Sequence, residues 1–148
     1  MSLSIAVATD NTRTPLSRER IDAIARATLR YERVRDAMVS ITLVDRRAIA
    51  RLNAEHLGHR GATDVISFGF TRSRTTDPVV GDIYICPAVA SENAKAHRAP
   101  VRDEIARLVI HGILHVLGHD HPEDRRETSD MWRRQERLLR RIVHGASR

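Results

Sequence analysis

The sequence predicts an α+β fold: a single domain, residues 1–148, with a mixed sheet of roughly four strands packed by helices. Three observations lead to this prediction. A chain of 148 residues is long enough to bury one hydrophobic core. Short runs rich in Ile and Val, or alternating with period two, are interleaved with segments whose apolar residues recur at helical spacing. Aromatic residues make up only 3% of the chain, so we expect an aliphatic core.

The first part of the chain alternates expected strands and helices. Leu3–Thr9 is rich in Ile and Val and predicts a strand. Ser17 is a polar cap for a helix whose apolar residues follow at three-to-four spacing. Met38–Val44 alternates with period two, as a half-buried strand does, and Asp45 then caps a short helix that ends near Gly58.

The rest of the chain contains two further strands and three further helices. Thr63–Phe70 and Gly81–Cys86 are expected to be strands, joined by a polar segment without periodicity that we expect to be a mobile loop, Thr71–Pro78. The helices are expected at Pro87–His97, at Val101–Leu117 and from Pro122 to about Val143.

Charge and cysteine content narrow the class of protein. The chain has 25 Lys and Arg against 19 Asp and Glu, and every basic residue except Lys95 is an arginine. Arginine suits phosphate, which favours a polyanionic partner, although a genomic preference for arginine codons explains the bias equally well. The few aromatics argue against binding single strands on stacked aromatic platforms. Cys86 is the only cysteine, which excludes an internal disulfide and indicates a reducing compartment.

Neither a secretory signal nor a membrane span is expected. Residues 1–10 have no basic start and only a short apolar run. The longest apolar stretch, Leu108–Gly118, is interrupted by two histidines and falls short of the roughly 20 residues that cross a bilayer. We therefore expect a soluble, cytoplasmic protein with no membrane partner.

Four of the eight histidines lie between Ile110 and His121. His111 and His115 are four residues apart and leave the same face of a helix that is apolar nearly all round. Two imidazoles in such a setting need polar partners, and a shared metal ion satisfies both. Gly118 permits a sharp exit from the helix that lets His121 fold back toward the first two rings. The spacing His-x3-His-x2-Gly-x2-His predicts three nitrogen ligands around zinc, with a fourth position open for catalysis.

Neighbouring residues leave some assignments open. His119 competes with His121 as the third ligand, and Asp120 either orients a ligand or caps the following helix. The pattern also matches extended zinc-protease motifs, except that Gly112 occupies the position of their catalytic glutamate. Because glycine accepts no proton, a peptidase mechanism lacks its base here.

Three blocks of this sequence are similar to the YbeY endoribonucleases, also described as rRNA maturation factors. His-Gly-Ile-Leu-His-Val-Leu-Gly-His-Asp-His at 111–121 resembles the family signature His-Gly-x-Leu-His-Leu-x-Gly-Tyr-Asp-His. Leu52-Asn53 followed by Thr63–Phe68 forms the second block, and Gly81–Ile83 forms the third. The resemblance covers most of the chain.

The resemblance implies a metal-dependent hydrolase that cleaves single-stranded RNA. It implies one Zn²⁺ per chain, bound by His111, His115 and His121, which act in catalysis through the metal. It further implies maturation of the 3′ end of small-subunit (16S) rRNA and ribosome quality control. The implied partners are rRNA, the small ribosomal subunit and assembly factors.

Two positions depart from the family pattern. Leu57 stands where many members carry an arginine near the metal, and His119 replaces the signature tyrosine. Arg60 and Arg72 are alternative phosphate contacts or ordinary solvated loop residues. We expect the Thr63–Phe68 strand to wall the cleft opposite the histidine helix. The candidates for residues that line the cleft or orient the ligands are Asp64, Ser67, His119 and Asp120.

Two other functions stay open at this level. A fourth protein ligand, such as His119, would indicate a ribosome-assembly binding protein with a structural zinc. A metallopeptidase-like hydrolase would need a base from outside the histidine helix, for which Glu104 is poorly positioned.

The expected C-terminal helix has two different sides. Five arginines lie largely on one side, which either contacts RNA phosphates or is simply solvated. The other side carries Met131, Trp132, Gln135, Leu138, Leu139 and Ile142.

Overall fold

A computed structural model describes residues 2–119 and 129–145. Within these residues, four strands form one mixed sheet in the order β1-β2-β4-β3. β1 (Leu3–Asp10) pairs in parallel with β2 (Ala37–Val44), and β2 pairs in parallel with β4 (Val79–Ile85). β3 (Val65–Phe70) runs antiparallel to β4 at one edge of the sheet. The predicted α+β class with a mixed sheet is confirmed.

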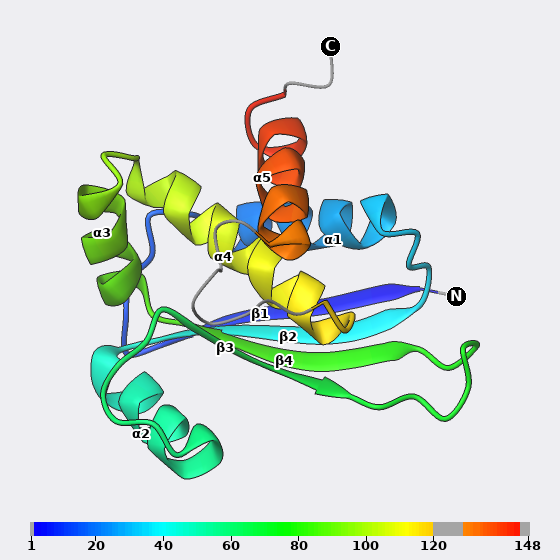
Figure 1. Ribbon diagram of the computed structural model, residues 1–148, viewed down its shortest axis with the longest axis horizontal. Coiled ribbons are helices and arrows are strands. Elements are labelled where there is room, and N and C mark those ends of the chain that lie inside the picture. Colours follow the sequence, from blue (N-terminus) through cyan, green and yellow to red (C-terminus); the bar gives the residue numbers. More distant parts are fainter. Residues whose placement is uncertain (1, 120–128, 146–148) are drawn as a thin grey trace.

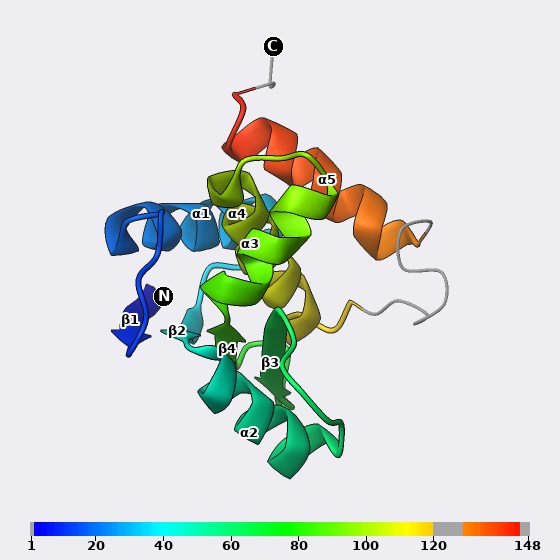
Figure 2. The same cartoon turned by 90° about the vertical axis from the view of Figure 1, so that its left-hand side faces the viewer.

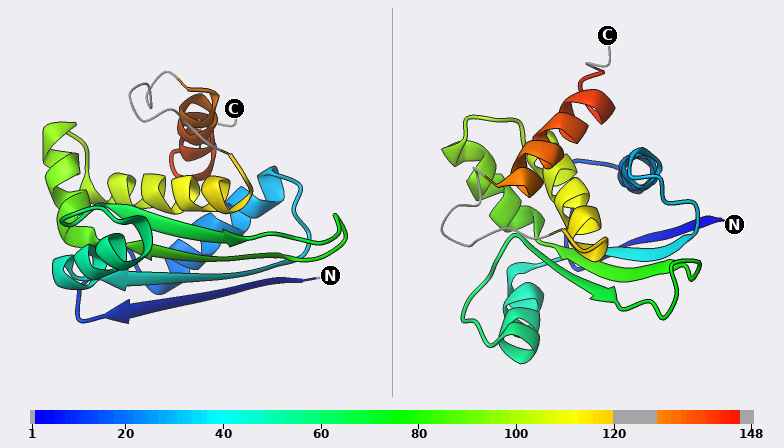
Figure 3. Two further views of the ribbon diagram at one scale, coloured as in Figure 1. Left: turned by 60° about the horizontal axis from the view of Figure 1, so that its bottom comes forward. Right: turned by 45° about the vertical axis from the view of Figure 1, so that its right-hand side comes forward.

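Helices cover both faces of the sheet, as Figures 1 and 2 show. α2 (Arg46–Leu57) lies on one face. α1 (Arg18–Tyr31) and α4 (Val101–Val116) cover the other face, and α3 (Pro87–Ala96) packs against α4. α5 (Asp130–Ile142) lies farther from the sheet, stacked on α4 and α1 (Figure 3). None of the helices in the described ranges is long and apolar enough to span a membrane.

The helix ends follow the capping signals in the sequence. The Ser17 hydroxyl accepts the N–H of Arg20 at 3.0 Å and so begins α1. The Asp45 carboxylate accepts the N–H of Ala48 at 2.8 Å, and this hydrogen bond is the main reason that the pKa of Asp45 is lowered. α2 ends at Gly58, whose φ of 68° lies in the left-handed region that favours glycine.

Three predicted elements begin two or more residues away from the expected position. β4 begins at Val79 rather than at Gly81 and ends at Ile85. β3 begins at Val65, because the Asp64 carboxylate accepts the N–H of Val65 at 2.8 Å and turns the chain there. α5 begins at Asp130, because Ser129 is extended and its hydroxyl accepts the N–H of Trp132. The expected unbroken helix from Pro122 is therefore wrong at Ser129. Residues 120–128 themselves lie outside the described part of the chain.

α4 is the central helix of the fold, and its residues from Glu104 to Leu114 are buried almost without interruption. It packs on β3 and β4 below and on α1, α3 and α5 around it. The buried apolar side chains of the described residues are aliphatic or sulfur-containing, as the low aromatic content predicted. A smaller apolar cluster lies around Ile49 of α2.

Glycine lets α4 approach the sheet closely. A Cβ at Gly112 would lie 2.8 Å from Cγ2 of Ile83, a fully buried residue of β4. A Cβ at Gly69 in β3 would lie 2.9 Å from the carbonyl oxygen of Val116. Gly112 therefore faces the sheet, and the position that holds a catalytic glutamate in zinc proteases is a packing position in this protein.

Gly112→Ala tests this close approach. Helix propensity alone would stabilise the protein by about 1 kcal/mol. Because the new methyl group collides with Ile83, we expect instead a loss of about 1–3 kcal/mol in the free energy of unfolding, measured by chemical denaturation. The same substitution in an Ile83→Ala background should cost less. A stabilised Gly112→Ala protein would contradict the packing argument.

Candidate metal centre

His111 and His115 occupy consecutive turns of the second half of α4 and lie side by side. Their ring centroids are 4.6 Å apart, and the ring planes are inclined at 73°. His111 is only 4% exposed. Both line a cleft of about 330 Å³ whose other residues come from the end of α2, the loop after it and the start of β3. The predicted pairing of these two rings on one helix face is present.

A hydrogen bond from α5 orients the His111 ring. Nδ1 of His111 lies 2.6 Å from Oε1 of Gln135, which is fully buried. The Gln135 amide nitrogen donates to Glu136 at 3.0 Å, so the amide oxygen is the atom that faces His111. Because that oxygen only accepts, Nδ1 must carry the proton. Nε2 is then the nitrogen of His111 with the lone pair that a metal ion needs.

The donor set so far fits zinc, which takes neutral imidazole nitrogens. The predicted third ligand, His121, and its neighbour Asp120 lie outside the described residues. Among residues 2–119 and 129–145, no group of three His, Cys, Asp or Glu side chains gathers as a metal site. The prediction of a three-histidine centre therefore stays a prediction, with two members side by side.

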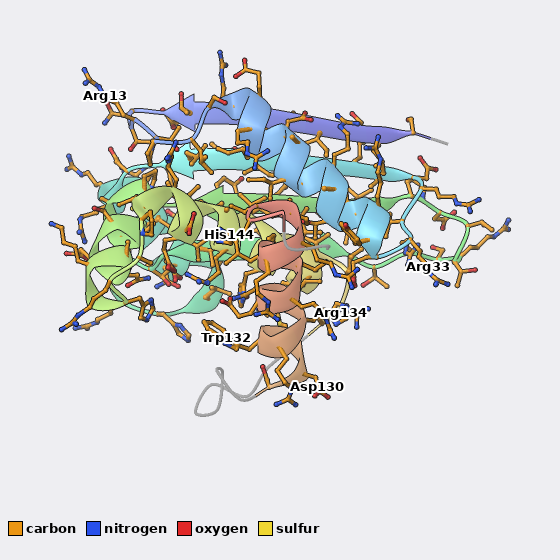
Figure 4. All side chains as sticks on the ribbon, turned by 90° about the horizontal axis from the view of Figure 1, so that it is seen from above. Arg13, Arg33, Asp130, Trp132, Arg134 and His144 are labelled. Carbon is orange, nitrogen blue, oxygen red and sulfur yellow. The ribbon has the colours of Figure 1, made fainter. Side chains whose placement is uncertain are left out.

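His119 faces a different partner. Its Nε2 lies 3.1 Å from Oε1 of Glu32, whose side chain is only 6% exposed at the end of α1. Arg134 of α5 donates to the other oxygen of the same carboxylate at 2.9 Å. Figure 4 shows Arg134 and Trp132 on opposite sides of α5. His119 thus belongs to a junction that joins α1, α4 and α5.

Asp64 and Ser67 line the same cleft as the two histidines. The Asp64 carboxylate accepts hydrogen bonds from the N–H of Val65 at 2.8 Å and from the side-chain amide of Asn93 at 3.1 Å. It therefore ties the start of β3 to α3. Ser67 lines the cleft from the middle of β3.

The loop after α2 forms the rim of the cleft. The side-chain amide of the buried Asn53 donates to the carbonyl of Gly61 at 3.1 Å, and the backbone carbonyl of Asn53 accepts the N–H of His59 at 3.2 Å. His59 and Leu57 both line the cleft. Leu57 is 48% exposed, so the rim of the cleft has an open apolar side chain at this position.

A second groove meets the cleft at His115. It has a volume of about 300 Å³ and is lined by the far end of β3, the end of α4 and Arg72. Arg72 is exposed, and its guanidinium donates to the carbonyls of Thr75 and Asp77, both at 3.3 Å. His115 therefore stands between two hollows that follow β3.

These features define an α+β protein with a histidine-lined cleft between its central helix and an edge strand. Comparison with known proteins is more specific. The chain belongs to the YbeY endoribonuclease family, because the family model described as "Endoribonuclease YbeY" matches residues 6–143.

Individual relatives agree with this assignment. A protein named endoribonuclease YbeY from Syntrophus aciditrophicus is 32% identical, and the match covers 98% of this chain and 92% of that one. One from Thermobifida fusca is 38% identical over 84% of this chain and 86% of its own. One from Kineococcus radiotolerans is 42% identical, over 66% of this chain and 62% of its own.

A solved structure has the same fold. The solution structure of a Thermotoga maritima protein superposes with a TM-score of 0.65 and covers 95% of this chain and 90% of its own. Its sequence identity is 23%, so the likeness concerns the fold alone.

Sequence reasoning missed several residues around the site. Gln135 lies on the predicted apolar side of its helix. The one amide among apolar residues was a signal that this side chain has a buried polar partner. His59 and Glu32 gave no signal, because their neighbours at the site come from distant parts of the chain.

His119→Phe tests whether His119 is a zinc ligand or only a structural contact. Because its Nε2 lies at Glu32, we expect the variant to bind as much zinc as the wild type, measured by metal analysis after dialysis. Its free energy of unfolding should fall by about 1 kcal/mol through loss of one hydrogen bond. Loss of zinc from His119→Phe would instead identify His119 as a ligand.

Proposed function

We propose that the protein is a zinc-dependent endoribonuclease that cleaves single-stranded RNA. The observation that carries this proposal is the His111–His115 pair at the cleft, with the His111 ring held by a buried amide. Membership of the YbeY endoribonuclease family supports the choice of RNA as substrate. The names of the relatives support an endonucleolytic reaction.

His111, His115 and the predicted ligand His121 would hold one zinc ion per chain. When bound, zinc polarises a phosphate oxygen and lowers the pKa of water. In this proposal the three histidines are catalytic through the metal. His119 is not needed as a fourth ligand, because its Nε2 lies 3.1 Å from Glu32, and this argues against a closed structural site.

The residues around His115 suit an extended polyanion. The cleft and the second groove both include His115, so the RNA can continue along β3 on both sides of the reacting phosphate. The exposed Arg72 guanidinium adds positive charge at one end of this path, where it donates to the backbone carbonyls of Thr75 and Asp77. Ser67 lines the cleft, and its hydroxyl is available for a hydrogen bond to the bound RNA.

A peptidase reaction is less well supported by the same residues. Gly112 packs on Ile83 and supplies no base, and the Asp64 carboxylate is already bonded to Val65 and Asn93. The buried Glu104 carboxylate accepts from Arg107 at 2.8 Å. These carboxylates are therefore engaged in structural contacts.

The family resemblance also supports a proposal for the cellular role. We place the reaction in the cytoplasm, at maturation of the 3′ end of small-subunit rRNA and in ribosome quality control. The partners in this proposal are rRNA, the small ribosomal subunit and assembly factors.

His115→Ala tests the proposed function. Loss of one of three ligands should remove bound zinc and lower the rate of RNA cleavage by more than about 100-fold. This is more than the usual effect of removing a residue that only hydrogen-bonds to a metal ligand. Metal analysis and cleavage of a labelled single-stranded RNA measure the two effects. His144→Ala is the matched control, because His144 pairs with Asp103 away from the cleft. Wild-type cleavage by zinc-free His115→Ala would identify a contaminating nuclease and defeat the proposal.

A further inference from the structure

Gln135 is an unusual residue for its position. It is 0% exposed on the side of α5 that otherwise buries Met131, Leu138 and Leu139. Burying an amide without hydrogen-bond partners costs on the order of 1–3 kcal/mol of folding free energy in proteins. Both ends of this amide are satisfied, one by His111 and the other by Glu136. A polar side chain is thus kept in an apolar row by two specific hydrogen bonds.

The amide cannot reverse without breaking a larger network. Glu136 accepts two hydrogen bonds from Arg107, at 2.8 and 3.1 Å, besides the one from Gln135. Arg107 also donates to the buried Glu104 at 2.8 Å. A reversed Gln135 amide would point its oxygen at the Glu136 carboxylate and its N–H groups at His111. Repulsion between the two acceptors opposes that state.

Arg107 keeps this network charged. Burial lowers its pKa, but hydrogen bonds and charge from Glu136 and then Glu104 outweigh burial, so the pKa of Arg107 is raised overall. The guanidinium therefore stays protonated and holds the Glu136 carboxylate in place. The carboxylate in turn fixes the direction of the Gln135 amide.

We infer that Gln135 is a positioning residue that fixes His111 in the tautomer with the proton on Nδ1, so that Nε2 is the ligand atom. The Glu104–Arg107–Glu136 network holds the amide in the required direction. This inference rests on the proposed function only in taking zinc as the ion that Nε2 binds. Residues of α4 and α5 that do not touch the metal thus affect how strongly His111 binds it.

The tautomer is measurable without metal. Ring nitrogen chemical shifts of His111 in ¹⁵N-labelled, metal-free protein distinguish a protonated nitrogen from one with a free lone pair. We expect a protonated Nδ1 and an unprotonated Nε2 in the wild type. Gln135→Met, similar in volume but with no acceptor oxygen, should lose this preference. Gln135→Glu, which keeps an acceptor, should retain it.

Zinc affinity gives the second readout. Competition with a chromophoric chelator should show about 10- to 100-fold weaker zinc binding by Gln135→Met, the usual effect of removing a partner of a ligating histidine. Gln135→Glu keeps an acceptor toward His111 but turns its second oxygen to the Glu136 carboxylate, so it should recover part of this affinity. Leu139→Ala is the matched control, because it truncates a buried side chain of the same helix and leaves the Gln135 amide that bonds to His111 in place. It should lose stability and keep both tautomer and affinity.

The outcomes separate the two proposals. A Gln135→Met protein with the wild-type tautomer and wild-type zinc affinity would overturn the positioning role. Equal loss of affinity in Leu139→Ala would also overturn it, since general destabilisation would then suffice. If wild-type protein shows the expected tautomer but binds no zinc, the proposed function fails and the orienting hydrogen bond stands.

Discussion

The close contact between α4 and the sheet is the constraint on which the site depends. Gly112 and Gly69 lie where a Cβ would strike the Ile83 side chain or the Val116 backbone, so the absence of a side chain at these two positions lets the helix pack closely on β3 and β4. This approach brings the face that carries His111 and His115 down to the edge strand. The cleft is the space that remains between that face, β3 and the loop after α2.

α5 completes the site from the opposite side of α4. Through Gln135 it reaches the inner nitrogen of His111, and through Arg134 it reaches the Glu32 carboxylate that also faces His119. α5 therefore supports the site, although none of its residues is among those that line the cleft. His111 is held by Gln135 of α5, and His119 is held by Glu32 at the end of α1. These different partners fit a metal ligand in the first case and a structural contact in the second.

Much of the fold followed from local patterns. Ser17 and Asp45 were readable as caps, period-two alternation located β2, and the apolar run around His111 indicated a buried helix. The start of α5 was misjudged, because the helix signal of residues 122–128 is continuous in sequence while Ser129 caps a new helix. Ser129 makes the same kind of cap as Ser17 and Asp45, but it stands inside a continuous run of helix-forming residues, where the local pattern does not show that a helix begins.

The site was only half predictable for a related reason. Helical spacing brings His111 and His115 together, so their pairing follows from sequence alone. The partners that orient side chains are distant along the chain: Gln135 is 24 residues from His111, and Glu32 is 87 residues from His119. Such pairs depend on how helices pack, and a single sequence does not specify that packing.

A crystal structure of zinc-loaded protein, with anomalous scattering recorded at the zinc edge, tests the central claim most directly. The account predicts zinc bound to Nε2 of His111, to His115 and to His121, with one coordination position free of protein atoms. A fourth protein ligand would contradict the open site. Rings that point apart, or coordination of His111 through Nδ1, would contradict the role assigned to the buried amide.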